Sequence, residues 1–455
     1  MRLLILYHAG FTYTPTIFHY LDAFRQHSVN KVEYFNIDQP CADVDFSGYD
    51  CLFVNFCVAS VSRIKPPPYF SRLLPALCRY RGVKVAAIQD EYDFTDKLKG
   101  FFAEVGFDVI LTNVPQEAVR QIYPEPWFDD VHFETVQTAY LAEDVVEAGR
   151  AALPLAERLI ALGYRGRELP CRFGDLGWQK GEVGRRFKAV CEAHGVDCDI
   201  AVDEASRFQG EDWLDFVRSC RVMLGTPSGC NVFDFDGSLH ASLVEQEKLI
   251  YRPGSVLFPD GPAAGRRVLK YEDVRDEVLA HDCGFDMGQV SARIFEAVAS
   301  STALALIRGN YSGVLRPDEH YVPIEPDYSN IDEVLDRILD IPVMQAMAAR
   351  AYAHVVGEPA NYYAGGLIER VDRLIAGVAV NGAAPDPGIG PGVPTTAVPM
   401  GIDPYLNAKL AEARIELKAA DARMAEAMRL AAEGRLDVVK HPDGTYRVLK
   451  FDEPR

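Results

Sequence analysis

Three ionisable side chains in the N-terminal part of the chain have the chemistry of a proton acceptor. His8 follows the apolar run at 2–7, and Asp90 and Glu91 follow the run at 84–89. An imidazole or a carboxylate within hydrogen-bond reach can take the proton of an attacking hydroxyl group. The same residue types also cap helices and close loops. His8, Asp90 and Glu91 are therefore candidates for a general base, with a structural role as the alternative.

Positive charge gathers further along the chain, after another apolar run. Arg165 and Arg167 follow the run that begins at Ala161, and Lys180 opens the next helical pattern. Fixed guanidinium and ammonium groups stabilise a growing negative charge most where water is excluded. The three side chains are candidates for binding an anionic group, and solvated surface charge is the alternative.

Two turns of small residues also follow predicted strands. One contains Ser228 and Gly229, and the other contains Tyr311, Ser312 and Gly313. Backbone amides in such turns can approach a phosphate group closely. A glycine-containing turn is more often only a turn, so that interpretation stays open.

The elements that position these residues follow from the alternation of apolar runs with amphipathic segments. A strand of a parallel sheet is buried on both faces, so its sequence is apolar throughout. Helical patterns at 70–80 and 95–105 lie between such runs. The predicted strands of the first part are 2–7, 31–37, 49–56, 84–89, 108–112 and 133–138. This order predicts a doubly wound, Rossmann-like domain over residues 1–150.

A second set of elements follows a predicted helix at 145–162. The predicted strands are 161–166, 198–202, 221–226 and 303–308, and the predicted helices are 178–194, 213–220, 290–300 and 331–339. Helical segments at 343–376 close this set. We therefore expect a second Rossmann-like domain over residues 151–376, facing the first across a cleft.

The C-terminal part has a different pattern. Residues 377–402 are rich in Pro, Gly and Ala without apolar periodicity, which predicts a linker. A helix with a heptad seam is predicted at 404–433, suited to self-association or to packing on the enzyme body. A hairpin is predicted at 436–451, around a Pro-Asp-Gly turn.

Charge and composition exclude several classes of protein. The formal net charge is −19, so the chain repels nucleic acid and anionic lipid surfaces. No stretch approaches the ~20 apolar residues that a membrane span needs, and the N-terminus lacks a signal peptide pattern. The ten cysteines form no Cys-x-x-Cys pair and are expected to be buried thiols. These features predict a soluble, cytoplasmic, globular protein.

The segment from 293 to 340 carries a resemblance to a known family. It places Arg-Ile-Phe-Glu-Ala before a small-residue turn, then the strand His-Tyr-Val-Pro-Ile at 320–324, then Asp-Tyr-Ser-Asn at 327–330 before a helix. This order resembles the donor-binding half of GT-B glycosyltransferases, in particular the bacterial group 1 kind. The resemblance covers residues 161–376 well and the first domain more loosely.

The resemblance implies a fold, a reaction and a set of binding residues. The fold is GT-B, with a last helix that crosses back to the first domain. The reaction transfers a sugar from a nucleotide-diphosphate sugar to a glycan or other hydroxyl acceptor, without a cofactor. The implied donor-binding residues are Arg165, Arg167, Lys180, Ser228, Gly229, Arg293, Glu296, Tyr311, Ser312 and Gly313. In that family a glutamate at the position of Glu296 holds the ribose hydroxyls, whereas an exposed helix Glu paired with Arg293 is the alternative.

Two features bear on details of this expectation. Relatives of this kind carry another glutamate shortly upstream, where this chain has Met287-Gly288-Gln289-Val290. Asp234-Phe235-Asp236 has the Asp-x-Asp spacing of a metal site, but transferases of this shape generally use cationic side chains instead, so no metal is expected.

Competing functions stay open at this stage. The first is a glycosyltransferase of surface polysaccharide or glycan biosynthesis in bacteria. Because fold does not determine function, a nucleotide-sugar epimerase or hydrolase is the second. The third is a non-catalytic subunit for assembly or carbohydrate binding, which the missing upstream glutamate favours.

Overall fold

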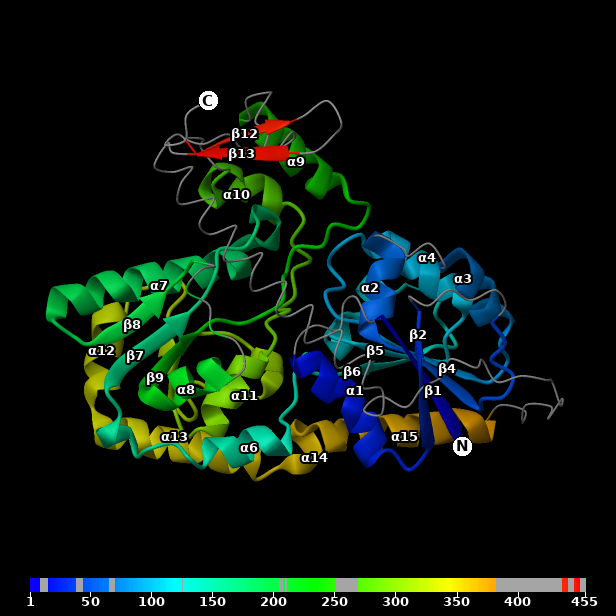
Figure 1. The fold of residues 1–455 in the computed structure, drawn as a ribbon, viewed down its shortest axis with the longest axis horizontal. Helices are drawn as coiled ribbons and strands as arrows, with labels where there is room; N and C mark the ends of the chain where they lie inside the picture. The colour runs from blue at the N-terminus through cyan, green and yellow to red at the C-terminus, as the bar shows by residue number, and fades with distance from the viewer. Residues whose placement is uncertain are drawn as a thin grey trace.

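The computed structural model describes most of the chain. The described residues are 1–381, apart from 9–14, 38–43, 65–69, 125, 204–205, 207, 209–210 and 251–268, together with the strands at 436–440 and 446–450. Two large parallel sheets lie side by side, the first in blue and cyan and the second in green and yellow (Figure 1). No helix among these residues combines the length and apolar character that crossing a membrane requires.

The first sheet has six parallel strands in the order β2-β1-β3-β4-β5-β6. Its strands are β1 (Arg2–Tyr7), β2 (Lys31–Asn36), β3 (Cys51–Val54), β4 (Val83–Ala87), β5 (Val109–Thr112) and β6 (His132–Thr135). All six predicted strands are confirmed, with ends moved by a few residues. Successive residues of β1 enter different core clusters, Leu4 on one face and Ile5 on the other, which explains the uninterrupted apolar runs.

Helices cover both faces of this sheet. They are α1 (Pro15–His27), α2 (Phe56–Ile64), α3 (Phe70–Arg79), α4 (Thr95–Val105), the 3-10 turn η2 (Gln116–Ala118) and α5 (Val119–Ile122). Helices α3 and α4 pack on one face through residues such as Leu77 and Phe101. Helix α1 packs on the other through Leu21 and Phe24. The predicted helices at 70–80 and 95–105 are α3 and α4.

The second sheet has five parallel strands in the order β11-β10-β9-β7-β8. Its strands are β7 (Ile160–Arg165), β8 (Cys198–Ala201), β9 (Cys220–Gly225), β10 (Ala303–Ile307) and β11 (Val322–Ile324). The helices around it are α6 (Glu143–Gly149), α7 (Gly174–His194), α8 (Glu211–Ser219), α11 (Ala292–Ala299), α12 (Ile331–Leu339) and α13 (Ile341–Val356), with the 3-10 turns η3 (Leu155–Glu157), η4 (Cys171–Phe173) and η6 (Tyr311–Gly313).

Two expectations for this half need correction, and two of its helices were not predicted. The predicted helix at 145–162 stops at Gly149, because Pro154 interrupts the helical backbone and Ile160 already starts β7. Helix α6 packs with α8 and α11 of the second sheet, so the first domain ends before residue 150. The helices α9 (Ser238–Ile250) and α10 (Tyr271–Leu279) between β9 and α11 were not predicted.

The segment that carries α9 and α10 joins the two domains. Its residues Phe233 and Tyr271 belong to the same apolar cluster as Tyr92 and α4 of the first domain. The backbone amide of Asp234 donates to the Tyr92 carbonyl at 2.8 Å. The second domain therefore reaches across and packs beside the C-terminal edge of the first sheet.

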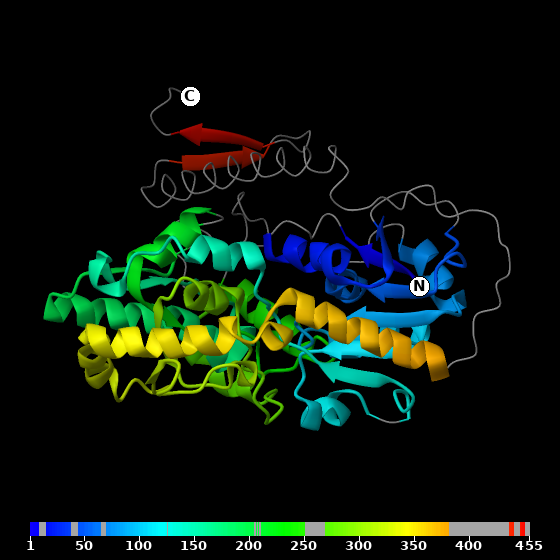
Figure 2. The same cartoon turned by 90° about the horizontal axis from the view of Figure 1, so that it is seen from below.

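After α13 the chain crosses back to the first domain, as the resemblance implied. After α13, the short α14 (Pro359–Tyr362) leads into α15 (Ala364–Asn381), which packs along α1 and under the first sheet (Figures 1 and 2). The Asp372 carboxylate accepts hydrogen bonds from the Ser28 hydroxyl at 2.9 Å and from the Val29 amide at 2.8 Å. Two Rossmann-like domains with this crossing helix are the expected α/β GT-B architecture.

Two predictions for the C-terminal part, the hairpin and the start of the linker, can be compared with the described residues. Strands β12 (Leu436–Lys440) and β13 (Tyr446–Lys450) pair as an antiparallel hairpin, as predicted. The predicted linker at 377–402 starts too early, because residues 377–381 still belong to α15. The rest of that linker and the heptad helix predicted at 404–433 lie outside the described residues.

Candidate functional site

A cavity of about 260 Å³ lies between the two domains. The first domain contributes the second turn of α1, the end of β4 and the segment after β6. The second domain contributes the turn after β9 and the amino end of α11. Among its lining residues are Ile17, His19, Tyr20, Phe56, Gln89, Asp90, Asn113, Tyr140, Ser228, Gly229, Gln289, Ser291, Phe295 and Glu296. Both sheets present the C-terminal ends of strands here, which is where doubly wound folds bind ligands.

Glu296 is the acidic group of the second domain in this cavity. It stands on α11, and its Oε2 accepts a hydrogen bond from the indole Nε1 of Trp213 at 2.6 Å. Burial raises the pKa of the Glu296 carboxyl, while the Trp213 bond and the nearby Arg293 and His19 oppose the rise. The carboxylate is thus held in place by its neighbours and faces the space between the domains.

A group of cations includes Arg293, the neighbour of Glu296. Arg293 is one helical turn before it, stacks over the Trp213 ring at 4.9 Å and donates to the Arg165 carbonyl oxygen. Lys180 on α7 donates from Nζ to the Pro227 carbonyl at 3.1 Å. Burial, together with the positive charges of Arg293 and Arg167, lowers the pKa of Lys180 to about 8. We call Lys180, Arg167 and Arg293 the cationic group.

This arrangement concentrates positive charge next to the turn that holds Ser228 and Gly229. Mutual repulsion is the reason that one cation depresses the pKa of another, and a bound anion relieves it. The amino end of α11 also opens on the cavity at Ser291, where the helix dipole favours an anion. The second domain is therefore built to accept negative charge at this edge of its sheet.

The turn after β9 has a backbone that requires glycine. Gly229 has a φ of +90°, and a Cβ atom there would lie 2.2 Å from the Met287 carbonyl oxygen. The Ser228 amide and carbonyl both pair with the backbone of Gln289 at 2.8 Å. Ser228 and Gly229 line the cavity, as expected, but the Ser228 amide is already used within the protein.

Arg165 is placed differently from the expectation. Nη2 makes two bonds of 2.8 Å to the Asp199 carboxylate, Nη1 binds the carbonyls of Tyr164 and Asp199, and Nε binds the Ser206 carbonyl. Its guanidinium also lies over two phenylalanine rings, Phe208 and Phe216, which contact each other. All five N–H donors of the side chain are used. Arg165 therefore holds β7 to its surroundings and does not take part in donor binding.

The turn with Tyr311, Ser312 and Gly313 also has a structural role. The amides of Ser312 and Gly313 donate to the carbonyls of Gly288 and Asn310 at 2.9 Å each. Tyr311 is fully buried and donates its hydroxyl to the Ile307 carbonyl at 2.6 Å. Two amides of this turn are therefore already bonded within the protein. The Ser312 hydroxyl donates to Gln289 Oε1 at 2.9 Å and positions that cavity residue.

The three proton-acceptor candidates of the first domain separate in the structure. Asp90 is exposed, lines the cavity and accepts a 2.6 Å bond from the Tyr92 hydroxyl. Glu91 is fully buried and does not line the cavity. Its carboxylate accepts bonds from the hydroxyls of Thr112 and Tyr123 and from the Asn113 amide, all at 2.8 Å or less. It therefore braces β5, which corrects its candidacy as a base.

His19 lies on the cavity, whereas His8, the predicted candidate, does not. His8 is buried at the end of β1 and is not among the residues that line the cavity. His19, on the second turn of α1, does line it, and its Nε2 lies 3.6 Å from a carboxylate oxygen of Asp144. Sequence reasoning missed His19. The available signal was its place early in the helix that follows β1, since the first turns of such helices border the ligand crevice.

The Asp-x-Asp segment folds as a helix cap. The Asp234 carboxylate accepts the amides of Leu239 and His240 at the start of α9, at 3.2 and 2.9 Å. Asp236 accepts the Ser238 amide at 2.9 Å. Among the described residues no cluster of three or more His, Cys, Asp and Glu side chains is placed to hold a metal ion.

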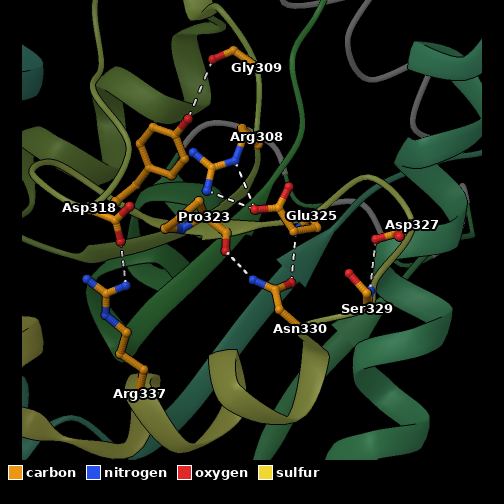
Figure 3. Close-up of polar contacts among 10 residues, drawn as sticks. Arg308, Gly309, Asp318, Pro323, Glu325, Asp327, Ser329, Asn330 and Arg337 are labelled. Carbon is orange, nitrogen blue, oxygen red and sulfur yellow. Dashed lines mark hydrogen bonds and ion pairs between the residues drawn. The ribbon is translucent and has the colours of Figure 1, made fainter.

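The segment after β11, which carries part of the resemblance to the family, stabilises the local structure (Figure 3). The Asn330 side chain accepts the Glu325 amide at 2.9 Å and donates to the Pro323 carbonyl at 3.0 Å. Glu325 in turn pairs with Arg308 at the end of β10. These bonds tie β11 to α12 and so stabilise the sheet edge. They lie away from the cavity, whose lining includes none of these residues.

Comparisons with known proteins found similarity only at the level of structure. No family model and no curated protein matches the chain. Anabaena HepE, solved with UDP, aligns over 83% of this chain and 100% of its own, with 11% identity and a TM-score of 0.43. T4 phage BGT, solved with UDP and Mn²⁺, aligns over 82% and 99%, with 10% identity and a TM-score of 0.43. Sucrose-phosphate synthase from Thermosynechococcus elongatus aligns over 84% and 100%, with 11% identity and a TM-score of 0.40.

Proposed function

We propose that this protein is a glycosyltransferase that moves a sugar from a nucleotide-diphosphate sugar to a hydroxyl acceptor. One observation carries the proposal. Glu296, held by Trp213, faces a cavity between the two domains, and Arg293, one helical turn before it, connects it to the rest of the cationic group. A carboxylate suits a ribose diol, because it can accept a hydrogen bond from each hydroxyl. Cations suit the diphosphate.

In this proposal the cationic group acts on the leaving diphosphate of the donor through its positive charge. When the bond between the sugar and the diphosphate breaks, negative charge grows on the leaving group. Lys180, Arg167 and Arg293 are fixed near that position, and preorganised charge stabilises a transition state without reorganisation. We propose that this cationic group replaces a metal ion.

The acceptor's role falls to the first domain. Asp90 and His19 lie on the same cavity as Glu296 but come from the opposite domain. Either is the right type of group to take the proton of the attacking hydroxyl. For transfer with inversion we propose Asp90 or His19 as that base; transfer with retention needs no such group. A cytoplasmic role in surface polysaccharide or glycan synthesis is part of the same proposal.

A thermal-shift screen against a panel of nucleotide sugars tests the proposal. A ligand at 100 times its Kd adds about 2.7 kcal/mol of stability. We expect one nucleotide class to raise Tm for the wild-type chain and to lose that effect in Glu296→Ala. A chain that no nucleotide sugar stabilises contradicts the proposal. Donor hydrolysis or epimer formation without any acceptor selects the hydrolase or epimerase reading instead.

A further inference from the structure

The acceptor-side wall of the cavity has a distinct chemistry. Ile17 and Tyr20 come from α1, Phe56 from α2 and Tyr140 from the segment after β6. The Tyr20 and Phe56 rings meet edge to face, with centroids 5.2 Å apart. The wall is therefore made of apolar faces, and two of its rings also carry a hydroxyl. Aromatic side chains of this kind offer a flat apolar surface together with a polar end.

Amide and hydroxyl groups surround this aromatic wall. Gln89 donates to the Thr138 carbonyl at 3.1 Å, and Asn113 donates to the Val136 carbonyl at 2.8 Å. Both amides thereby keep a fixed orientation while lining the cavity. A few oriented polar groups among apolar walls are typical of a small-molecule site. Sugar rings match this mixture, since they have apolar C–H faces and a rim of hydroxyls.

The charges on the cavity exclude one kind of acceptor. Apart from tyrosines, the ionisable residues of its described lining are Asp90, Glu296 and His19, and that lining contains neither lysine nor arginine. The cationic group lies behind the turn at Pro227, outside this lining. On the first-domain side of the cavity, a phosphate or carboxylate would face the Asp90 carboxylate, and the described lining offers no lysine or arginine beside it. Burying an unpaired charge in that setting is costly.

We propose that the acceptor is an uncharged glycoside whose sugar ring stacks on Tyr20, Phe56 and Tyr140. Acceptors with a phosphate or carboxylate next to the attacking hydroxyl are excluded. This proposal rests on the proposed glycosyltransferase function and adds the chemical class of the acceptor. The aromatic wall selects the ring, and the Asp90 carboxylate on the same side of the cavity repels the anion.

The test uses the full chain, with the nucleotide sugar identified by thermal shift as donor. Acceptors are matched pairs, methyl hexosides against the corresponding methyl hexuronides and hexose phosphates. We expect kcat/KM for the neutral member of a pair to exceed that for the anionic member by at least tenfold. Equal or faster transfer to the anionic member overturns the proposal. So does a nucleotide-saturated enzyme that neither binds nor glycosylates any neutral glycoside.

Two variants sharpen the result. Thr16 is exposed at the cavity, and Thr16→Arg is expected to raise kcat/KM for the hexuronide several-fold, whereas Thr16→Gln does not. Tyr140→Ala is expected to raise KM for the neutral glycoside about three- to tenfold, the range of an aromatic contact, whereas Tyr140→Phe keeps the ring and most of the affinity. An unchanged preference in Thr16→Arg together with an unchanged KM in Tyr140→Ala contradicts the proposal.

Nucleotide affinity separates this proposal from the one on which it rests. Calorimetry with the nucleoside diphosphate is performed on the same preparations. A chain that binds no nucleotide contradicts the glycosyltransferase itself. Normal nucleotide binding together with a preference for anionic acceptors overturns the acceptor class alone.

Discussion

Two arginines two residues apart, Arg165 and Arg167, end in opposite situations at the same edge of the second sheet. Arg165 is buried, and every N–H of its guanidinium is bonded within the protein. Arg167 is exposed, and its charge acts on Lys180. The comparison teaches that a position at a strand end does not by itself make a cation a binding residue, since Arg165 uses all of its donors within the protein. The position of a residue in the sequence makes it a candidate, and its hydrogen-bond partners in the folded protein determine its role.

The sharpest way to break this comparison is to remove each arginine in turn. Arg165→Ala is expected to lower the free energy of unfolding by about 3 kcal/mol, because the charged bonds to Asp199 and the packing against Phe208 and Phe216 are lost. Arg167→Ala is expected to change it by no more than about 0.5 kcal/mol and to weaken nucleotide binding instead. Urea unfolding and calorimetry measure the two effects. Equal stability losses in the two variants would mean that the distinction is wrong.

The same test of a structural against a binding role can be applied to the Glu296 carboxylate. Glu296→Ala is expected to weaken nucleotide binding at least tenfold, about 1.4 kcal/mol, since the ribose hydroxyls lose their acceptor. Glu296→Gln keeps the size and one oxygen for Trp213 and is expected to lose less. Calorimetry with the nucleoside diphosphate gives both values. An affinity in Glu296→Ala equal to that of the wild type would remove Glu296 from the donor site.

Lys180 offers a test by pH alone. Its pKa is about 8 in the free protein, and a bound diphosphate raises it, so binding takes up a proton at higher pH. Affinity is therefore constant below pH 8 and falls by up to about tenfold per pH unit above it. Lys180→Arg stays charged throughout, and its affinity is expected to be flat over the same range. A wild-type affinity that does not change between pH 7 and 9.5 counts against contact between Lys180 and the donor.

Much of the fold was predictable, because burial on both faces leaves a direct trace in the sequence. The runs that became β1 and β10 are apolar throughout, and each end was placed within a few residues. Helices α9 and α10 were missed, since they follow irregular loops and belong to no repeating strand and helix order. They belong to the same apolar cluster as Tyr92, which is distant from them in the sequence.

The site was predictable in part. Glu296 was selected through the family resemblance and Asp90 through its place after a predicted strand; both line the cavity, and their roles stay predictions. Arg165 and Glu91 were misjudged because the groups that use them are remote or come from the backbone. The bonds to Glu91 come from Thr112, Asn113 and Tyr123 on the next strand and helix. Such partners are invisible until the chain is folded.

The smallest expected effect concerns a buried histidine far from the cavity, which sharpens the same distinction between a structural and a binding role. His320 is almost fully buried, and its ring stacks on His354 at 4.5 Å. Burial lowers the pKa of His320, and His354, Arg316 and Arg350 lower it further, while Glu319 opposes them.

His320 thus stays neutral when folded and takes up a proton near pH 6.5 when unfolded. Its contribution is complete above that pH and is lost as pH falls below it. We expect Tm of the wild type to fall between pH 6.5 and 5 more steeply than Tm of His320→Asn, whose side-chain oxygen can still accept the Arg316 amide. Nucleotide affinity at fixed pH is expected to be the same for both proteins, because His320 supports the fold and does not touch the donor. Parallel Tm profiles for the two proteins would show that His320 does not contribute to the acid sensitivity.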